Sequence, residues 1–128
     1  MVTVEERYEH LEKTIRGYNI SADLSQIRAA YEYAREHHGE QMRRDGTPFI
    51  THPINVAQIV AEMRLDSESI IAALLHDCIE DTDTTYEDVA KIFGVTVADI
   101  VDGVTKLTRV KYSTMEEEQM ENLRKMLF

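Results

Sequence analysis

The chain has 128 residues, and its 24 acidic side chains against 14 basic ones give a formal net charge of −10. A chain of this length suits one compact domain, which buries roughly two thirds of the surface that the unfolded chain exposes. The negative charge repels nucleic acid and anionic membranes, so we expect neither as a partner. A phosphate-bearing ligand therefore needs a local basic patch on this protein.

Cysteine content and hydropathy indicate the compartment. The one cysteine, Cys78, excludes an internal disulfide, and the sequence has no CxxC pair. The N-terminus carries no apolar signal segment, and the longest apolar run, residues 70–75, is far shorter than the ~20 residues that span a bilayer. These features predict a soluble, cytoplasmic protein.

Apolar residues recur at helical spacing along almost the whole chain, and only two prolines and five glycines interrupt them. The pattern predicts an all-α fold, a helical bundle of about seven helices. The expected helices cover residues 4–18, 22–38, 53–64, 67–80, about 84–94 and 97–106, with a seventh that begins near residue 115. Because no repeat, linker or second boundary is visible, residues 1–128 are expected to form one domain.

Turn and cap residues set the expected helix boundaries. Ser21 is the expected N-cap of the second helix, and Gly39 is expected to end that helix. Pro53 suits the first position of the third helix, where its missing N–H has no role. Thr84 and Glu87 have the spacing of a capping box, which predicts the start of the fifth helix.

The seventh helix is expected to begin at a capping box over residues 113–117, and it is still in progress at Phe128. Because no cap or stop signal follows, we expect the chain to be a fragment of a longer protein, incomplete at its C-terminus. An apolar stripe on this helix is an expected surface for self-association. The stripe consists of Leu123, Met126 and Leu127.

The strongest chemical feature is the group His76, Asp77, Glu80 and Asp81 at the end of the helix expected over residues 67–80. On one continuous helix these four side chains fall within an arc of roughly 140°. An imidazole beside a carboxylate can bind a divalent cation, and an acidic pair one turn later can orient or deprotonate a water molecule. Any one such residue, taken alone, usually lies on a solvated helix face. Four of them beside an apolar run favour a hydrolytic site.

A further histidine, His52, stands directly before Pro53. Taken alone, such a histidine is more often a capping or packing residue than a metal ligand. Together with His76 and Asp77 it forms a mixed set of imidazoles and carboxylate. This set suits manganese or iron(II) better than a structural zinc, which prefers thiolates.

A long loop is expected over residues 39–50, which have no sustained period. Its turn signals are Asp45-Gly46 and Thr47-Pro48. Arg43 and Arg44 in this loop supply the basic patch that a phosphate-bearing ligand needs, because an arginine can pair with a phosphate or stack on a purine. An arginine pair on a loop is solvated surface in most proteins, but the nearby His52 favours ligand binding.

Other polar residues have less specific interpretations. His37 and His38, at the end of the second helix, are expected to interact with the helix dipole or to lie on the surface. Cys78 is expected to be a small core residue. A second basic cluster could contact phosphates or balance the acidic residues after it, and both interpretations stay open. This cluster consists of Lys106, Arg109 and Lys111.

Three short signatures stand out along the chain, namely His52-Pro53, His76-Asp77 and Glu80-Asp81-Thr82. They resemble the signatures of the HD superfamily, and specifically of its RelA/SpoT homologues. The resemblance covers nearly the whole chain, including residues 30–34, 46–53, 72–77 and 103–107. It implies that the helical bundle is an HD domain.

The resemblance also implies three groups of site residues: metal ligands, a catalytic acidic pair, and a basic pair against the guanine nucleotide. The metal ligands are His52, His76 and Asp77. The catalytic pair is Glu80 and Asp81, and the basic pair is Arg43 and Arg44. The residue after the basic pair is usually serine in the family. Here it is Asp45, whose role the resemblance leaves open.

The implied activity is manganese-dependent hydrolysis of the 3′-pyrophosphate of guanosine tetra- and pentaphosphate to GDP or GTP and pyrophosphate, in stringent-response control. The resemblance also implies a longer, bifunctional parent chain with downstream synthetase and regulatory domains. The family's metal site takes a further aspartate from a motif absent here, so we expect this fragment to be weakly active or inactive. Two alternatives stay open: a catalytically silent nucleotide-binding HD module, and an HD phosphohydrolase of another nucleotide.

Overall fold

The computed structural model describes residues 2–105. Within this part of the chain there is no β-strand, only an isolated bridge between Met42 and Pro48. The helices are α1 (Val4–Tyr18), α2 (Leu24–His38), α3 (Thr51–Glu62), α4 (Ser67–Leu75), α5 (Cys78–Asp81) and α6 (Tyr86–Phe93). Residues 95–105 are also helical. The predicted all-α fold is confirmed.

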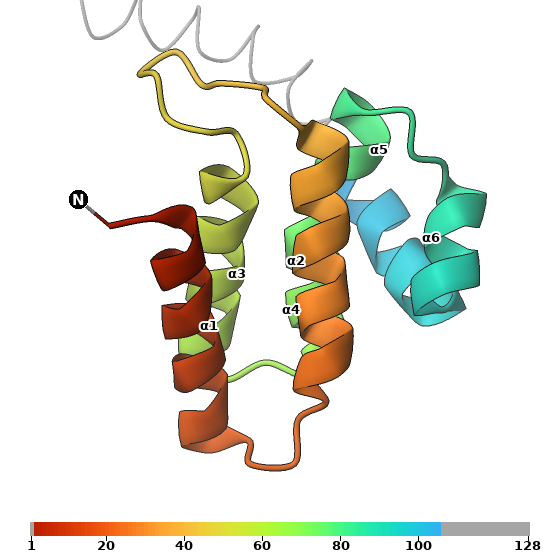
Figure 1. The fold of residues 1–128 in the computed structure, drawn as a ribbon. Helices are drawn as coiled ribbons and strands as arrows, with labels where there is room; N and C mark the ends of the chain where they lie inside the picture. The colour runs from red at the N-terminus through yellow and green to blue at the C-terminus, as the bar shows by residue number, and fades with distance from the viewer. Residues whose placement is uncertain (1, 106–128) are drawn as a thin grey trace, which may run out of the picture.

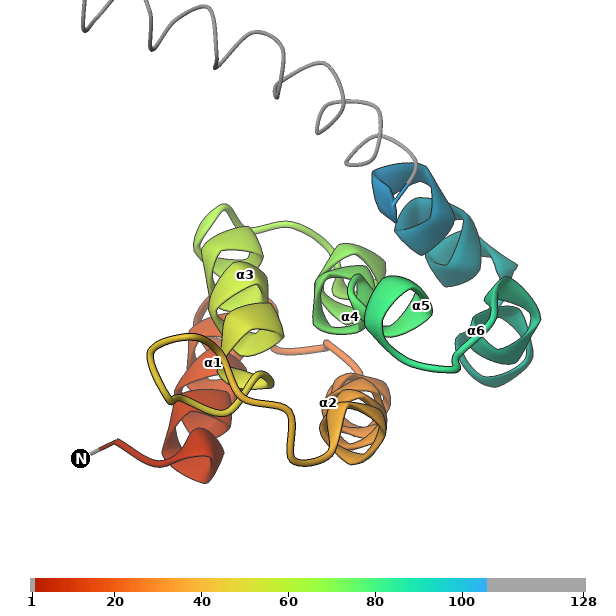
Figure 2. The same ribbon diagram turned by 90° about the horizontal axis from the view of Figure 1, so that it is seen from above.

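The first four helices form the body of the molecule (Figure 1). Consecutive helices run in opposite directions; α3 packs against both α1 and α4, and α2 packs against α4. Seen from above, α6 and the helix over 95–105 lie beyond α5, on the side away from α1 (Figure 2). Because the helices alternate in direction, the end of α2, the start of α3 and the end of α4 meet at one end of the body.

The core forms where the apolar stripes of these helices face one another. Every helix of the body contributes side chains with no more than 1% of their surface exposed, for example Leu11, Ile27, Ile54 and Leu74. Cys78, at the start of α5, is fully buried, so its predicted place in the core is confirmed. None of the helices in residues 2–105 is long and apolar enough to cross a membrane.

Several predicted helix starts and caps were wrong by one or two residues. The N-cap of α2 is Asp23 and not Ser21, because the Asp23 carboxylate accepts hydrogen bonds from the backbone N–H groups of the first turn. The capping box of α6 is formed by Thr85 and Asp88, one residue after the predicted pair. Pro53 is the third residue of α3, which is still within the turn whose N–H groups have no helical partner.

The helix predicted over residues 67–80 is interrupted at His76 and Asp77, which form a turn between α4 and α5. Nδ1 of His76 lies 2.6 Å from the carbonyl oxygen of Ala73. In an unbroken helix that carbonyl would accept from the N–H of residue 77. The imidazole of His76 therefore occupies the acceptor that the backbone N–H of residue 77 would use in a continuous helix. The prediction of one continuous polar face was wrong.

Some predicted features lie outside the described residues. They are the seventh helix near residue 115, the apolar stripe of Leu123, Met126 and Leu127, and the basic cluster of Lys106, Arg109 and Lys111.

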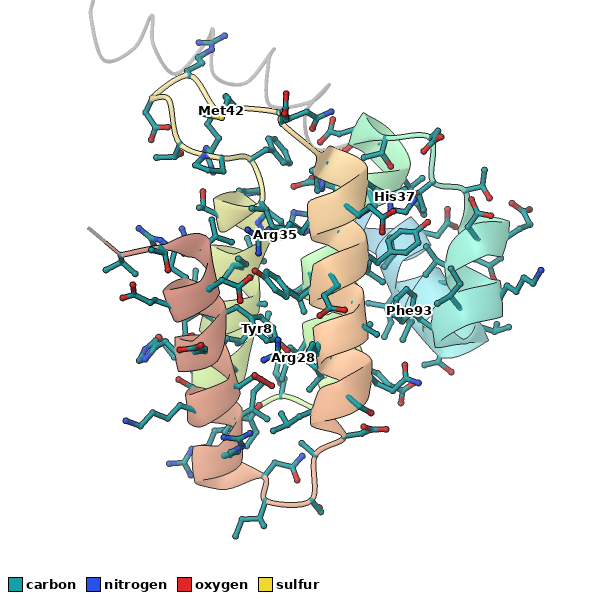
Figure 3. All side chains as sticks on the ribbon, viewed as in Figure 1. Tyr8, Arg28, Arg35, His37, Met42 and Phe93 are labelled. Carbon is teal, nitrogen blue, oxygen red and sulfur yellow. The ribbon has the colours of Figure 1, made fainter. Side chains whose placement is uncertain are left out.

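A layer of aromatic and charged side chains joins α1 to α2 (Figure 3). The rings of Tyr8 and Tyr31 stack with their centroids 4.1 Å apart, and the guanidinium of Arg28 lies 5.0 Å from the centroid of the Tyr8 ring. Arg28 also forms an ion pair with Glu12 at 2.7 Å. The Tyr8 hydroxyl is buried, and no residue among 2–105 offers it a hydrogen bond. Its burial raises the pKa of Tyr8.

We expect Tyr8→Phe to raise the free energy of unfolding by about 1 kcal/mol, because a buried hydroxyl without a partner costs desolvation free energy. Tyr31→Phe is the matched control, since the Tyr31 hydroxyl donates to Glu5 and accepts from Arg35. This control should lose about 1 kcal/mol. Urea denaturation measures both values. Equal losses in the two variants would mean that the Tyr8 hydroxyl has a partner after all.

Candidate metal and nucleotide site

His52, His76 and Asp77 meet at the end of the body where α3 begins and α4 ends. The Nε2 atoms of His52 and His76 lie 3.3 Å and 3.1 Å from the same oxygen, Oδ2 of Asp77. One donor atom from each residue lies within 4.8 Å of the other two. Two imidazole nitrogens and a carboxylate oxygen that converge in this way suit a divalent transition metal.

Local backbone geometry orients the imidazole of His76. The carbonyl oxygen of Ala73 can only accept, so Nδ1 of His76 carries a proton. In the protonated imidazole Nε2 donates to Oδ2 of Asp77 at 3.1 Å, and in the neutral imidazole it keeps the lone pair that would bind a metal. Metal-binding histidines are usually held in this way, with the second ring nitrogen donating to a carbonyl or carboxylate. His52 lies in the first turn of α3, with its ring centroid 5.4 Å from that of His76.

The electrostatics of the cluster keep Asp77 ionised. Burial disfavours its carboxylate, but the hydrogen bond from His76 and the neighbouring imidazoles lower the pKa of Asp77. Burial also opposes the charged form of His76, yet its contacts with Asp77 and Ala73 raise the pKa of His76. Burial lowers the pKa of His52, against the attraction of Asp77. At neutral pH the cluster therefore offers an anionic oxygen beside the neutral imidazole of His52.

The acidic pair Glu80 and Asp81 lies on α5, one turn after Asp77, and both side chains are exposed. Partial burial and then the negative charges of Asp77 and Glu80 raise the pKa of Asp81. Asp81 in turn favours the charged forms of His52 and His76. A carboxylate with a raised pKa beside a candidate metal site is suited to accept a proton from water.

A pocket of about 550 Å³ joins this cluster to the loop before α3. His52 and Asp77 line it, and so do both arginines of the predicted basic pair, Arg43 and Arg44. The remaining lining residues are Met42, Asp45 and Phe49; Figure 3 shows Met42 on the loop. Cationic side chains and candidate metal ligands that open onto one pocket suit a ligand that carries phosphate.

The loop that carries the basic pair is a hydrogen-bonded hairpin. The N–H of Arg43 donates to the Thr47 carbonyl at 2.8 Å, and the N–H of Gly46 donates to the Arg43 carbonyl at 2.9 Å. Gly46 has a φ of +86°, which favours glycine. The Asp45 carboxylate accepts from the backbone N–H and the hydroxyl of Thr47, and these bonds lower the pKa of Asp45. Asp45 therefore stabilises the turn that presents the basic pair.

Two polar residues near the site, His38 and Gln41, were not recognised from the sequence. His38 is only 2% exposed, so the surface position, one of its two predicted roles, was wrong. It does lie in the last turn of α2, where the other prediction, an interaction with the helix dipole, places it. Nδ1 of His38 lies 3.2 Å from Oε1 of Gln41, and its Nε2 lies 3.8 Å from Sγ of Cys78. Gln41 donates from Nε2 to the carbonyl of Asp81 at 3.2 Å. Burial raises the pKa of Cys78 to about 12, so the thiol stays protonated.

Comparison with known proteins identifies the family. The family described as HD domain matches residues 30–128, a span that contains the His–Asp cluster and the whole lining of the pocket. The chain belongs to the HD domain family. The resemblance found in the sequence is thereby confirmed, and the bundle is an HD domain.

Several curated proteins are similar to this HD domain over most of its length. The guanosine-3′,5′-bis(diphosphate) 3′-pyrophosphohydrolase of Aquifex aeolicus is 52% identical over 119 residues, which are 93% of this chain and 16% of that protein. The bifunctional (p)ppGpp synthase/hydrolase SpoT of Escherichia coli K12 is 48% identical over 94% of this chain and 17% of its own length. A GTP pyrophosphokinase of Myxococcus xanthus is 45% identical over 89% of this chain and 16% of its own length. The chain thus spans about one sixth of these relatives.

A solved structure is also similar to this HD domain. It is described as a metazoan orthologue of SpoT that hydrolyses ppGpp and plays a role in starvation responses. The two structures align with a TM-score of 0.59 and 39% sequence identity, over 62% of this chain and 47% of the other.

Proposed function

We propose that this HD domain hydrolyses the 3′-pyrophosphate of guanosine tetra- and pentaphosphate to GDP or GTP and pyrophosphate. The observation that carries the proposal is the pocket that Arg43 and Arg44 share with His52 and Asp77. It brings cations that suit a phosphorylated nucleotide beside donor atoms that suit a metal. The names of the Aquifex and Escherichia relatives, about half identical to this chain, support guanosine 3′,5′-bis(diphosphate) as the substrate.

We infer that His52, His76 and Asp77 hold a divalent cation, and that this cation is manganese. The support is the donor set itself, in which the bond from Nδ1 to Ala73 leaves Nε2 of His76 for coordination. Mixed nitrogen and oxygen ligands suit manganese, and the cluster lacks the thiolates that a structural zinc prefers. A cation bound there supplies Lewis acidity to the phosphoryl group and to water.

The side chains around this cluster have separate roles in the proposed reaction. Arg43 and Arg44 hold the nucleotide, because arginine pairs with phosphate and stacks on purines. Glu80 and Asp81 orient the attacking water and accept its proton. The water attacks the phosphorus nearest the ribose, the bond between that phosphorus and the 3′ oxygen breaks, and the 3′ oxygen takes up a proton. The products are GDP or GTP and pyrophosphate.

We propose that the HD domain works in the cytoplasm within a longer chain that carries synthetase and regulatory domains after it, in stringent-response control. The support is that the chain spans about one sixth of its curated relatives, one of which is named as bifunctional and another as a GTP pyrophosphokinase. Self-association through Leu123, Met126 and Leu127 is a further proposal, and these residues lie outside the described part of the chain.

The test is a panel of nucleotides incubated with the full-length protein and manganese. We expect guanosine tetra- and pentaphosphate to be consumed at least about a hundredfold faster than GTP or dGTP, because a site that binds specific polar groups rejects analogues that lack them. Comparable rates across the panel would favour an HD phosphohydrolase of another nucleotide. Tight binding of the tetraphosphate without turnover would instead identify a silent nucleotide-binding module.

We expect Arg43→Ala and Arg44→Ala each to raise the KM for guanosine tetraphosphate about tenfold or more while changing kcat much less, because each variant loses a charge-assisted contact with the bound nucleotide. Arg16→Ala is the matched control, since Arg16 is an exposed arginine in the last turn of α1, outside the pocket lining. Steady-state kinetics measure both constants. An unchanged KM in both loop variants would contradict the assignment of this pair to the nucleotide.

A further inference from the structure

One chain of hydrogen bonds begins and ends on α5. Sγ of Cys78, the first residue of α5, lies 3.8 Å from Nε2 of His38, the last residue of α2. Nδ1 of His38 lies 3.2 Å from Oε1 of Gln41, at the start of the hairpin. Nε2 of Gln41 then donates to the carbonyl of Asp81, the last residue of α5, at 3.2 Å.

The Asp81 carbonyl, at the end of this series of hydrogen bonds, determines which atom donates in each of them. The Asp81 carbonyl can only accept, so the amide nitrogen of Gln41 faces it and the amide oxygen faces His38. That oxygen can only accept from Nδ1 of His38, which leaves Nε2 as the acceptor for the S–H of Cys78. All three contacts are therefore compatible with one neutral tautomer of His38.

Gln41 is also fixed through its backbone. Its N–H donates to the His38 carbonyl at 3.1 Å, and its carbonyl accepts from the N–H of Phe49 at 2.9 Å. Phe49 lines the pocket and its ring lies 4.6 Å from that of His38, measured between centroids. The backbone of Gln41 thus belongs to the hairpin that carries the basic pair, while its side chain reaches α5.

The helix α5 needs such external support. It has four residues, and a single helical turn is unstable by itself because nucleation fixes several dihedral angles for each hydrogen bond gained. Its internal bonds include those from the N–H of Asp81 to the Asp77 carbonyl and from the N–H of Thr82 to the Cys78 carbonyl. Any displacement of α5 would move Glu80 and Asp81 relative to the His–Asp cluster.

We propose that Gln41 and His38 are positioning residues, which clamp α5 against the hairpin. The clamp keeps the acidic pair, Glu80 and Asp81, at a fixed position beside the bound nucleotide. The role in catalysis rests on the proposed hydrolase function. The clamp itself is a feature of the fold, and hydrogen exchange measures it independently of activity.

The kinetic test uses Gln41→Ala in the full-length protein with manganese and guanosine tetraphosphate. The hairpin keeps its backbone bonds, so we expect kcat to fall about tenfold or more while KM stays within about twofold, because small misplacements of catalytic groups are costly. In a Glu80→Gln background the same change should cost less than about twofold, since Gln41 acts through the acidic pair. Gln41→Glu keeps the acceptor for His38 but loses the donor to Asp81, and it should reproduce the loss of kcat.

Gln26→Ala is the control, because Gln26 is an exposed glutamine on α2 whose side chain has no hydrogen bond within residues 2–105. We expect it to leave kcat unchanged. An equal loss of kcat from Gln41→Ala in the wild-type and Glu80→Gln backgrounds would reduce Gln41 to a merely structural role and overturn the proposal.

Hydrogen exchange tests the clamp without reference to activity. We expect Gln41→Ala to speed exchange at the amides of Asp81 and Thr82 at least about tenfold while exchange in α1 and α3 stays unchanged. Unchanged exchange in α5 would overturn the clamp even if kcat fell. Faster exchange with unchanged kcat would overturn its role in catalysis. If the wild-type protein shows no hydrolysis, the proposed function and the catalytic role both fail, and exchange still decides whether the clamp exists.

Discussion

Asp77→Asn is expected to abolish both manganese binding and hydrolysis in the full-length protein. The carboxylate of Asp77 is the point on which the Nε2 atoms of His52 and His76 converge, at 3.3 Å and 3.1 Å. An amide of the same shape lacks the negative charge that a hard divalent cation requires, so little affinity should remain. Isothermal titration with Mn²⁺ and a product assay measure the two losses.

Asp83→Asn is the matched control, because Asp83 is an exposed carboxylate close in sequence that lies outside the His–Asp cluster. We expect it to bind manganese and turn over normally. Retained activity in Asp77→Asn, together with wild-type metal content, would show that Asp77 is no ligand.

Glu80→Gln is expected to lower kcat by roughly 10²-fold or more while nucleotide affinity stays near normal, because general-base catalysis typically contributes that much to rate. Glu80 lies on α5, one turn beyond Asp77. Rapid-quench turnover and equilibrium binding of a non-hydrolysable guanosine tetraphosphate analogue separate the two quantities.

The assignment of Glu80 to catalysis and of Asp77 to metal binding can be tested directly. Glu80→Gln should keep its manganese content, in contrast to Asp77→Asn. Equal losses of rate and nucleotide affinity, or loss of the metal, would assign Glu80 to binding and refute its role as the group that accepts the proton.

The sequence was sufficient to predict the helical fold, because helical periodicity and local turn signals are short-range properties. The meeting of His52 with Asp77 was predicted from their residue types and from the family resemblance. The sequence also indicated that Arg43 and Arg44 would lie close to His52, since only seven residues separate Arg44 from His52 in the sequence. The structure places all four residues around one pocket. Their chemical roles remain predictions that the variants above test.

The features missed from the sequence depend on side chains that replace or bridge backbone groups. The helix is interrupted at His76 and Asp77, where the His76 imidazole contacts the Ala73 carbonyl. The hydrophobic periodicity of a sequence gives no sign of such a contact. The contact between Gln41 and Asp81 joins residues 40 positions apart. Only the packing of α2 against α5 brings these groups together, so a single sequence carries no signal for them.

Radiolabelled guanosine tetraphosphate, with ³²P at the outer phosphorus of its 3′-pyrophosphate, tests the central claim most directly. Incubated with the full-length protein and Mn²⁺, it should release all of its label as pyrophosphate, with one GDP formed for each pyrophosphate, and EDTA should stop the reaction. Release of the label as orthophosphate, or full turnover in the presence of EDTA, would contradict a metal-dependent 3′-pyrophosphohydrolase built on His52, His76 and Asp77.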